Sequence, residues 1–195
     1  MTCAGLLLAA GAGRRIGTPK ALLHDSDGTP WVRRAAVLLA GAGCSPVLVV
    51  LGAEDERARA LLPPGVDVVV ADDWADGMGA SLRAGLAALP ELAPDADAAL
   101  VLLVDLPDLV PAVVRRVAEH AGPGALARAT YGDTDDARHG HPVLLGRDHW
   151  PGAAGTASGD RGARDYLEAQ GVVSVDCSDL AGGADVDTAA DAIGG

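Results

Sequence analysis

The sequence predicts an α/β fold built on a mostly parallel central sheet. Through the first seventy residues, short apolar segments alternate with helical ones, which is the pattern of strands joined by right-handed crossovers. Residues 46–51 are apolar at every position, which indicates a strand that is buried on both faces. A chain of 195 residues suffices for one domain with a substantial core, so we expect a single domain over residues 1–195.

The individual elements follow from apolar periodicity and from Gly and Pro at their ends. Trp31, Ala35 and Leu38 give an apolar face to a helix that Thr29 is expected to cap and Pro30 to start. The strongest strand pattern is AALVLLV at residues 98–104. The predicted strands are 6–10, 46–51, 66–70, 98–104, 125–131 and 172–175, and the predicted helices are 30–42, 55–62, one ending at 89, 109–121, 159–169 and a short C-terminal one.

The composition and net charge of the chain indicate which kinds of binding partner to expect. Hydrophobic residues make up 49% of the chain and charged residues 22%, as expected for a globular protein. The net charge of −12 argues against a nucleic acid or an anionic membrane as partner. The first apolar run, about seven residues without a basic segment before it, predicts neither a signal peptide nor a membrane span. Cys3, Cys44 and Cys177 lack metal-ligand spacing, so we expect incidental or buried thiols in a reducing cytosol.

Residues 6–20, LLLAAGAGRRIGTPK, carry the clearest functional pattern. An apolar strand that runs into a glycine-rich loop, here with Gly11 and Gly13, brings bare backbone N–H groups up to phosphate oxygens. Arg15 adds positive charge, and so does Lys20, the only lysine in a chain whose other fourteen cationic side chains are arginines. Lysine acts at a phosphate as a point charge and arginine as a flat fork, so we expect a specific anion contact at Lys20.

Two familiar glycine loops do not fit this segment. The dinucleotide fingerprint GxGxxG needs glycine where Ile16 stands, and Gly17 comes one residue late. The phosphate loop of nucleoside triphosphatases needs Gly-Lys-Ser/Thr, whereas Pro19 precedes Lys20 here. By itself, the loop is also compatible with a plain turn between a strand and a helix.

Three further segments have both a structural and a functional interpretation. Residues 72–82, with Gly77 and Ser81, form either a helix cap or a second wall of a ligand site. Asp105 follows a predicted strand, where open parallel sheets bind their ligands, and it either holds Mg²⁺ or caps the next helix. His141, placed before a proline in a predicted loop, is either a general base or a structural or substrate contact.

Six motifs, in this order, resemble the MobA-like NTP transferases and specifically the cytidylyltransferases of the molybdenum cofactor: LAAGAGRRIGTPK, WADGMGASLRAGL, LVDLPDL, GHPVLL, GDRGARDYL and DVDTAAD. The resemblance covers essentially the whole chain. It implies a three-layer α/β/α Rossmann-like fold and Mg²⁺-dependent transfer of a nucleotidyl group to a phosphate. The chain departs from the usual family pattern at Ile16, where Met is common, at Asp72, near a common Asn, and at Leu106, where Gln is common.

The resemblance also implies roles for individual residues. The second alanine of Leu8-Ala9-Ala10-Gly11, in place of glycine, resembles the branch that uses CTP rather than GTP. Lys20, Arg15 and Asp105 would neutralise charge during the reaction. The implied sites are Leu8, Ala9, Ala10, Gly11, Gly13, Gly77 and Ser81 for the nucleotide, Arg15 and Lys20 for its triphosphate, Asp105 and Asp187 for Mg²⁺, and His141, Asp160 and Gly162 for the acceptor.

The implied reaction is attack by an acceptor phosphate on the α-phosphorus of CTP, with release of pyrophosphate. A phosphate nucleophile is already ionised at neutral pH and needs no general base. The acceptor would be molybdopterin or the molybdenum cofactor in the cytoplasm, and a molybdoenzyme would receive the product. Four alternatives stay open: another small phosphate acceptor such as a sugar or alcohol phosphate, GTP as the donor, a non-catalytic carrier of the cofactor, and a nicotinamide-dependent dehydrogenase.

Overall fold

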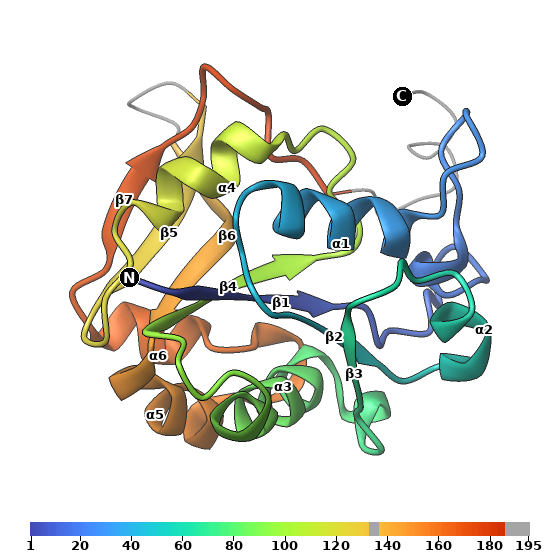
Figure 1. Ribbon diagram of the computed structural model, residues 1–195, viewed down its shortest axis with the longest axis horizontal. Helices are drawn as coiled ribbons and strands as arrows, with labels where there is room; N and C mark the ends of the chain where they lie inside the picture. Colours follow the sequence, from blue (N-terminus) through green and yellow to red (C-terminus); the bar gives the residue numbers. More distant parts are fainter. Residues whose placement is uncertain (133–136, 186–195) are drawn as a thin grey trace.

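A seven-stranded sheet runs through the centre of the computed structural model, which describes residues 1–132 and 137–185 (Figure 1). β1 pairs in parallel with β2 and β4, while β6 is antiparallel to both of its neighbours. The mostly parallel sheet predicted from the sequence is therefore confirmed. In spatial order the strands are β3 (Asp67–Val70), β2 (Val47–Leu51), β1 (Cys3–Leu8), β4 (Ala98–Leu103), β6 (Arg138–Gly146), β5 (Leu126–Tyr131) and β7 (Val173–Asp176).

Helices cover both faces of the sheet and complete three layers. On one face lie α1 (Trp31–Gly41) and α4 (Pro111–Ala118). The other face carries α3 (Met78–Leu92), α5 (Trp150–Thr156) and α6 (Arg164–Ala169) (Figure 1). The short helix α2 (Asp55–Arg59) follows β2, and four 3-10 turns complete the elements: η1 (Lys20–Leu22), η2 (Trp74–Asp76), η3 (Arg147–His149) and η4 (Gly159–Arg161).

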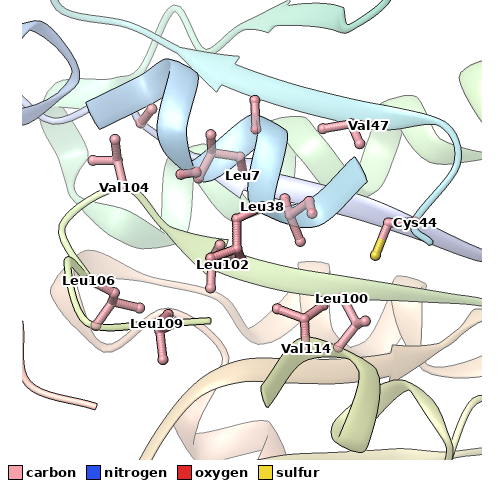
Figure 2. Packing of buried hydrophobic residues seen from close by; sticks show 14 of the residues in the cluster. Leu7, Leu38, Cys44, Val47, Leu100, Leu102, Val104, Leu106, Leu109 and Val114 are labelled. Atoms are coloured by element: carbon pink, nitrogen blue, oxygen red, sulfur yellow. The ribbon is translucent and has the colours of Figure 1, made fainter. Parts of the chain in front are cut away.

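The core is divided by the sheet into two apolar clusters. Because successive side chains of a strand point to opposite faces, Leu7 of β1 packs on the α1 side, whereas Leu6 and Leu8 pack on the α3 side. Figure 2 shows part of the first cluster, in which Leu7 lies near Leu38 of α1. The central strand β2 is thus buried on both faces, as its continuous apolar run predicts, whereas the edge strands β3 and β7 are partly exposed.

Several helix boundaries differ from the prediction. α1 starts at Trp31, and Pro30 is its extended N-cap residue rather than its first helical residue. α4 starts with Pro111, as suits a residue without an N–H group to donate. α6 starts only at Arg164, because Gly162 has a positive φ of 55° that interrupts any helix begun at η4. α5 was not predicted, since WPGAAGT combines a proline with two glycines.

β6 corrects the prediction that His141 lies in a loop. His141 and Pro142 are both within this strand. Pairing of β6 with β5 is irregular opposite Arg128 to Thr130, and pairing with β4 starts only at Val143. Pro142 therefore occupies a position where the ladder does not need an N–H donor, which is where a strand tolerates proline.

Two further predictions concern membranes and cysteines. None of the helices described here is long and apolar enough to cross a membrane. Cys44 and Cys177 are buried and Cys3 is partly buried, and all three are free thiols. The predicted C-terminal helix and Asp187 lie outside the described residues.

Candidate active site

A cavity of about 790 Å³ lies beyond the carboxyl ends of β1 and β4. We call it the larger cavity. Its walls include Leu8 at the end of β1 and Leu103 at the end of β4. This is the edge at which parallel sheets bind ligands, since the strand ends leave a crevice between the loops that follow them. Of the residues implied for the nucleotide, its triphosphate and Mg²⁺, the following line it: Leu8, Ala9, Ala10, Gly11, Gly13, Arg15, Lys20, Gly77, Ser81 and Asp105.

The glycine loop forms one wall of the larger cavity. Its backbone makes a tight turn in which the N–H groups of Ile16 and Gly17 both donate to the carbonyl of Gly13. Gly13 has a φ of 60°, and a Cβ there would lie 1.9 Å from the carbonyl oxygen of Thr18, so this glycine is needed for the turn itself. Gly11 differs, because a Cβ there would meet no atom within 4 Å. A glycine that the fold does not require, on a cavity wall, leaves room for a ligand to approach the backbone.

The opposite wall is the N-terminus of α3. The helix starts after Gly77 and has no side-chain cap, so the alternative that residues 72–82 only form a helix cap does not hold. Ser81 is instead a buried polar residue of the cavity wall. Gly77 has a φ of 103°, and a Cβ there would lie 2.7 Å from the backbone of Gly159. This glycine therefore lets the start of α3 approach η4, and uncapped N–H groups at a helix start favour an anion.

Lys20 and Asp105 meet in the wall between these segments. The Nζ atom of Lys20 lies 2.5 Å from the Oδ2 atom of Asp105, and the side chains are 19% and 12% exposed. Asp105 does not cap α4, whose N-cap residue is Val110. The two residues come together because β1 and β4 are adjacent parallel strands, so the segments that follow them emerge side by side. Lys20 and Arg15 both make further interactions beyond this ion pair.

The carboxylate of Asp105 has an oxygen atom available for a divalent cation. The Oδ1 atom of Asp105 is buried and accepts no hydrogen bond within the described part of the chain. A buried carboxylate oxygen with a lone pair to spare fits a hard cation, which prefers oxygen ligands. No three His, Cys, Asp or Glu side chains of residues 1–132 and 137–185 gather as metal ligands. Asp187, the second ligand implied by the resemblance, is outside those ranges.

A second, smaller cavity of about 370 Å³ opens beside the larger one. Its walls are β4, β5 and β6 on the sheet side and α3 and α6 on the helix side, with an apolar lining from residues such as Val101, Leu145 and Leu167. Several polar residues also reach it, among them Arg128 and His139. The two cavities share the lining residues Leu8, Met78, Leu103, Asp160, Arg164 and Asp185.

The residues implied for the acceptor do not all reach a cavity. Asp160 lines both cavities, and His141 lines the smaller one. Burial lowers the pKa of His141 to about 4, against which the charges of Asp105 and Asp185 act, so its ring is neutral at pH 7. Gly162 is buried, pairs with Ser158 and lines neither cavity.

Asp185 is a cavity residue that the sequence analysis did not assign. It lines both cavities. The carboxylate of Asp108 anchors the segment before it by accepting hydrogen bonds of 2.8 and 2.9 Å from the N–H groups of Gly182 and Gly183. The Gly-Gly pair that precedes Asp185 is a sequence signal for such a close approach, but its partner on another strand end is not visible from the sequence.

Residues 5–175 match the family of MobA-like NTP transferase domains. The chain belongs to this family. The predicted fold and the predicted enzyme class, a nucleotidyltransferase, are confirmed at the level of the MobA-like NTP transferase domain.

The relatives of this chain include one protein that is named as an oxidoreductase and one that is named as a nucleotidyltransferase. The chain is 43% identical over 192 residues to the nicotine blue oxidoreductase of Paenarthrobacter nicotinovorans, covering 94% of this chain and 91% of that protein. It is 32% identical over 105 residues to a probable molybdenum cofactor guanylyltransferase of Rhodopirellula baltica, covering 54% of this chain and 49% of the relative. Among solved structures, Rv0371c of Mycobacterium tuberculosis superimposes with a TM-score of 0.82 at 30% identity, covering 98% of this chain and 95% of the other. A complex of Rv0371c with manganese gives a TM-score of 0.77 at 28% identity, with the same coverage of both chains.

Proposed function

We propose that this MobA-like domain transfers CMP from CTP to the phosphate of molybdopterin or the molybdenum cofactor and releases pyrophosphate. The observation that carries the proposal is the pair of connected cavities, with Lys20 and Asp105 on the wall of the larger one. The larger cavity has the glycine loop and the cations that a triphosphate requires. The smaller cavity opens beside it and would take the acceptor.

In the proposed reaction, an oxygen of the acceptor phosphate attacks the α-phosphorus of CTP, and the bond to the pyrophosphate oxygen breaks. The nucleophile is ionised at pH 7, so no side chain has to remove a proton. This agrees with the neutral ring of His141, whose pKa burial lowers to about 4. A neutral ring neither repels nor attracts the charged groups of the acceptor. Lys20 and Arg15 stabilise the negative charge that moves onto the leaving pyrophosphate, and the loop backbone orients the phosphates.

Asp105, with its spare buried oxygen, would hold Mg²⁺, and Asp187 would supply a second carboxylate. The bound cation would supply charge neutralisation at the phosphates. The Lys20–Asp105 pair supports this assignment, because the ammonium group beside the carboxylate fixes the position of that carboxylate before substrates bind. The manganese complex of the similar Rv0371c is a further reason to propose a divalent cation.

The donor base, the compartment and the receiving protein belong to the proposal as well. Ala10 is a buried residue of the larger cavity wall, in the position where the resemblance distinguishes CTP from GTP. We propose CTP as the donor, the cytoplasm as the compartment, and a molybdoenzyme as the receiver of the product. Replacing Ala10 by glycine should increase turnover with GTP relative to CTP, since removal of the methyl group widens the wall for a purine.

A second candidate is an oxidoreductase that keeps the nucleotide-binding architecture of the family. The observation that favours it is the 43% identity to nicotine blue oxidoreductase over 94% of this chain. Against it, an oxidoreductase gives no reason for a buried carboxylate with a spare oxygen beside the chain's only lysine.

One experiment separates the candidates. The purified chain is mixed with Mg²⁺ and each of the four nucleoside triphosphates, with and without molybdopterin, and pyrophosphate is measured. A transferase releases pyrophosphate with CTP only when the acceptor is present. A carrier binds without turnover, and an oxidoreductase instead consumes a reduced nicotinamide cofactor in a parallel assay to which an electron-accepting dye is added.

A further inference from the structure

The smaller cavity lies between the sheet and two helices. Val143 of β6 and Leu103 of β4 line it on the sheet side, and Leu82 of α3 and Leu167 of α6 line it on the helix side. Apolar walls of this kind, on opposite sides of one cavity, suit a flat ring that buries both faces. A cavity of about 370 Å³ has room for a bicyclic ligand rather than a long chain.

Arg128 of β5 is a polar residue of the smaller cavity whose hydrogen bonds are incomplete. Its Nε atom is buried and has no hydrogen-bond partner among the described residues. Its Nη2 atom lies 2.9 Å from the Nε2 atom of His139. Arginine can only donate, so this ring nitrogen accepts the hydrogen bond. His139 thereby accepts a hydrogen bond from one N–H of the guanidinium, and the Nε–H has no acceptor among the described residues.

The surroundings of Arg128 disfavour its positive charge. Burial lowers the pKa of its guanidinium, and the charge of Arg164 acts in the same direction, although Glu168 opposes it. Burial also lowers the pKa of His139, with the charge of Arg128 as a further cause, so the neighbour that accepts from Arg128 is neutral. Arg116, in contrast, contacts the carboxylate of Asp179.

We propose that Arg128 is the specificity-determining residue of the smaller cavity and binds the oxygen-bearing edge of a planar, oxo-substituted heteroaromatic ring. The ring would lie between the apolar walls, and its oxo group would accept the hydrogen bond that the Nε–H of Arg128 lacks. A polar group left unsatisfied in the folded protein, on the wall of a cavity, is explained when its partner is the ligand. The inference rests on the proposed function, whose acceptor carries such a ring, and adds to it the residue that recognises the ring.

The test uses pterin, which is 2-amino-4-oxopteridine, and 2-aminopteridine, which lacks the oxo group. The binding of each is titrated by its fluorescence against the wild-type chain and against Arg128→Met and Arg128→Lys. Arg115→Met is the matched control, since Arg115 is exposed on α4, on the opposite face of the sheet. Thermal unfolding and binding of CTP with Mg²⁺ are measured for each variant as readouts of the fold and of the larger cavity.

We expect the wild-type chain to bind pterin about ten times more tightly than 2-aminopteridine, as for loss of one hydrogen bond to a charged group. In Arg128→Met, pterin should bind about tenfold more weakly, with no preference over 2-aminopteridine. Arg128→Lys should be intermediate, because it keeps the charge and loses the fork. The melting temperature of Arg128→Met should equal or exceed that of the wild type, since a structural role for Arg128 would lower it.

Two results would overturn the inference. One is a wild-type chain that does not bind pterin or binds both compounds equally, and the other is an unchanged preference in Arg128→Met. These results are distinct from failure of the proposed function, which is measured as pyrophosphate release. If no nucleotide is turned over while Arg128→Met still loses its preference for pterin, the ring site holds and the transferase proposal fails.

Discussion

Replacement of Asp105 by asparagine should separate the role of this carboxylate in turnover from its contribution to the stability of the fold. The change removes one charge and keeps the size of the side chain. It breaks an ion pair with Lys20 of 2.5 Å whose partners are 12% and 19% exposed. Removing one partner of a fully buried pair costs about 3–5 kcal/mol, and partial exposure should reduce this to about 1–3 kcal/mol. For a chain of this size, that corresponds to a melting temperature lower by roughly 2–12 °C.

The effect on turnover should be larger than the effect on stability suggests. Loss of one charge-stabilising contact costs about 3 kcal/mol in the transition state, or roughly a hundredfold in rate. We therefore expect Asp105→Asn to release pyrophosphate from CTP at least a hundredfold more slowly, in an assay kept well below its melting temperature. CTP with Mg²⁺ at about a hundred times its Kd should stabilise the wild type by about 2.7 kcal/mol and the variant by much less.

The control for this experiment is Asp108→Asn, which changes a carboxylate near the site that accepts hydrogen bonds from Gly182 and Gly183. It should lower stability with a smaller loss of turnover. The assignment of Asp105 to the cation would be refuted if the folded Asp105→Asn variant released pyrophosphate at the wild-type rate. It would also be refuted if CTP with Mg²⁺ stabilised the wild type and the variant equally.

Further variants test the other parts of the site. Lys20→Ala should slow pyrophosphate release about a hundredfold while the fold persists, and Lys20→Arg should restore only part of the rate, because a flat fork replaces a point charge. Gly77→Ala should lower the free energy of unfolding by about 1–3 kcal/mol in urea titrations, since its φ is 103° and its Cβ would lie 2.7 Å from Gly159. Gly11→Ala, whose Cβ meets no atom within 4 Å, should leave that free energy unchanged and weaken CTP binding in calorimetry. His141 has a folded-state pKa of about 4 against 6.5 in the unfolded chain, so the unfolded state takes up the proton first and wild-type stability falls as the pH drops from 6.5 to 4. Relative to His141→Gln, the loss should reach up to about 3 kcal/mol in urea titrations at several pH values, and parallel pH profiles of the two proteins would contradict it.

The larger cavity was predictable from the sequence for a physical reason. Segments that follow adjacent parallel strands must emerge at the same edge of the sheet, so a loop after residues 3–8 and a carboxylate after residues 98–103 come together. The pairing of Lys20 with Asp105 follows from this topology. Periodicity also predicts the sheet and most helices, because their apolar faces are regular.

The smaller cavity was less predictable, because it depends on contacts between distant segments. β6 runs antiparallel between β4 and β5, and its register with β5 shifts between Arg128 and Thr130. Neither the direction nor the shift has a local sequence signal. α5 was missed because its helix is stabilised by tertiary contacts, such as the hydrogen bond of 2.9 Å from Trp150 Nε1 to the carbonyl of Leu145, rather than by intrinsic propensity.

The relatives show which part of the site the direct tests have to address. A family shares its fold and its nucleotide-binding architecture, while the chemistry depends on particular side chains in the site. This chain resembles both a probable guanylyltransferase and an oxidoreductase in sequence. The residues that differ between such reactions would be those of the acceptor side.

The most direct test of the central claim is mass spectrometry of the acceptor after incubation with the purified chain, CTP and Mg²⁺. Nucleotidyl transfer predicts that molybdopterin gains the mass of a CMP group and that pyrophosphate appears in equal amount. An acceptor of unchanged mass with every nucleoside triphosphate would contradict it.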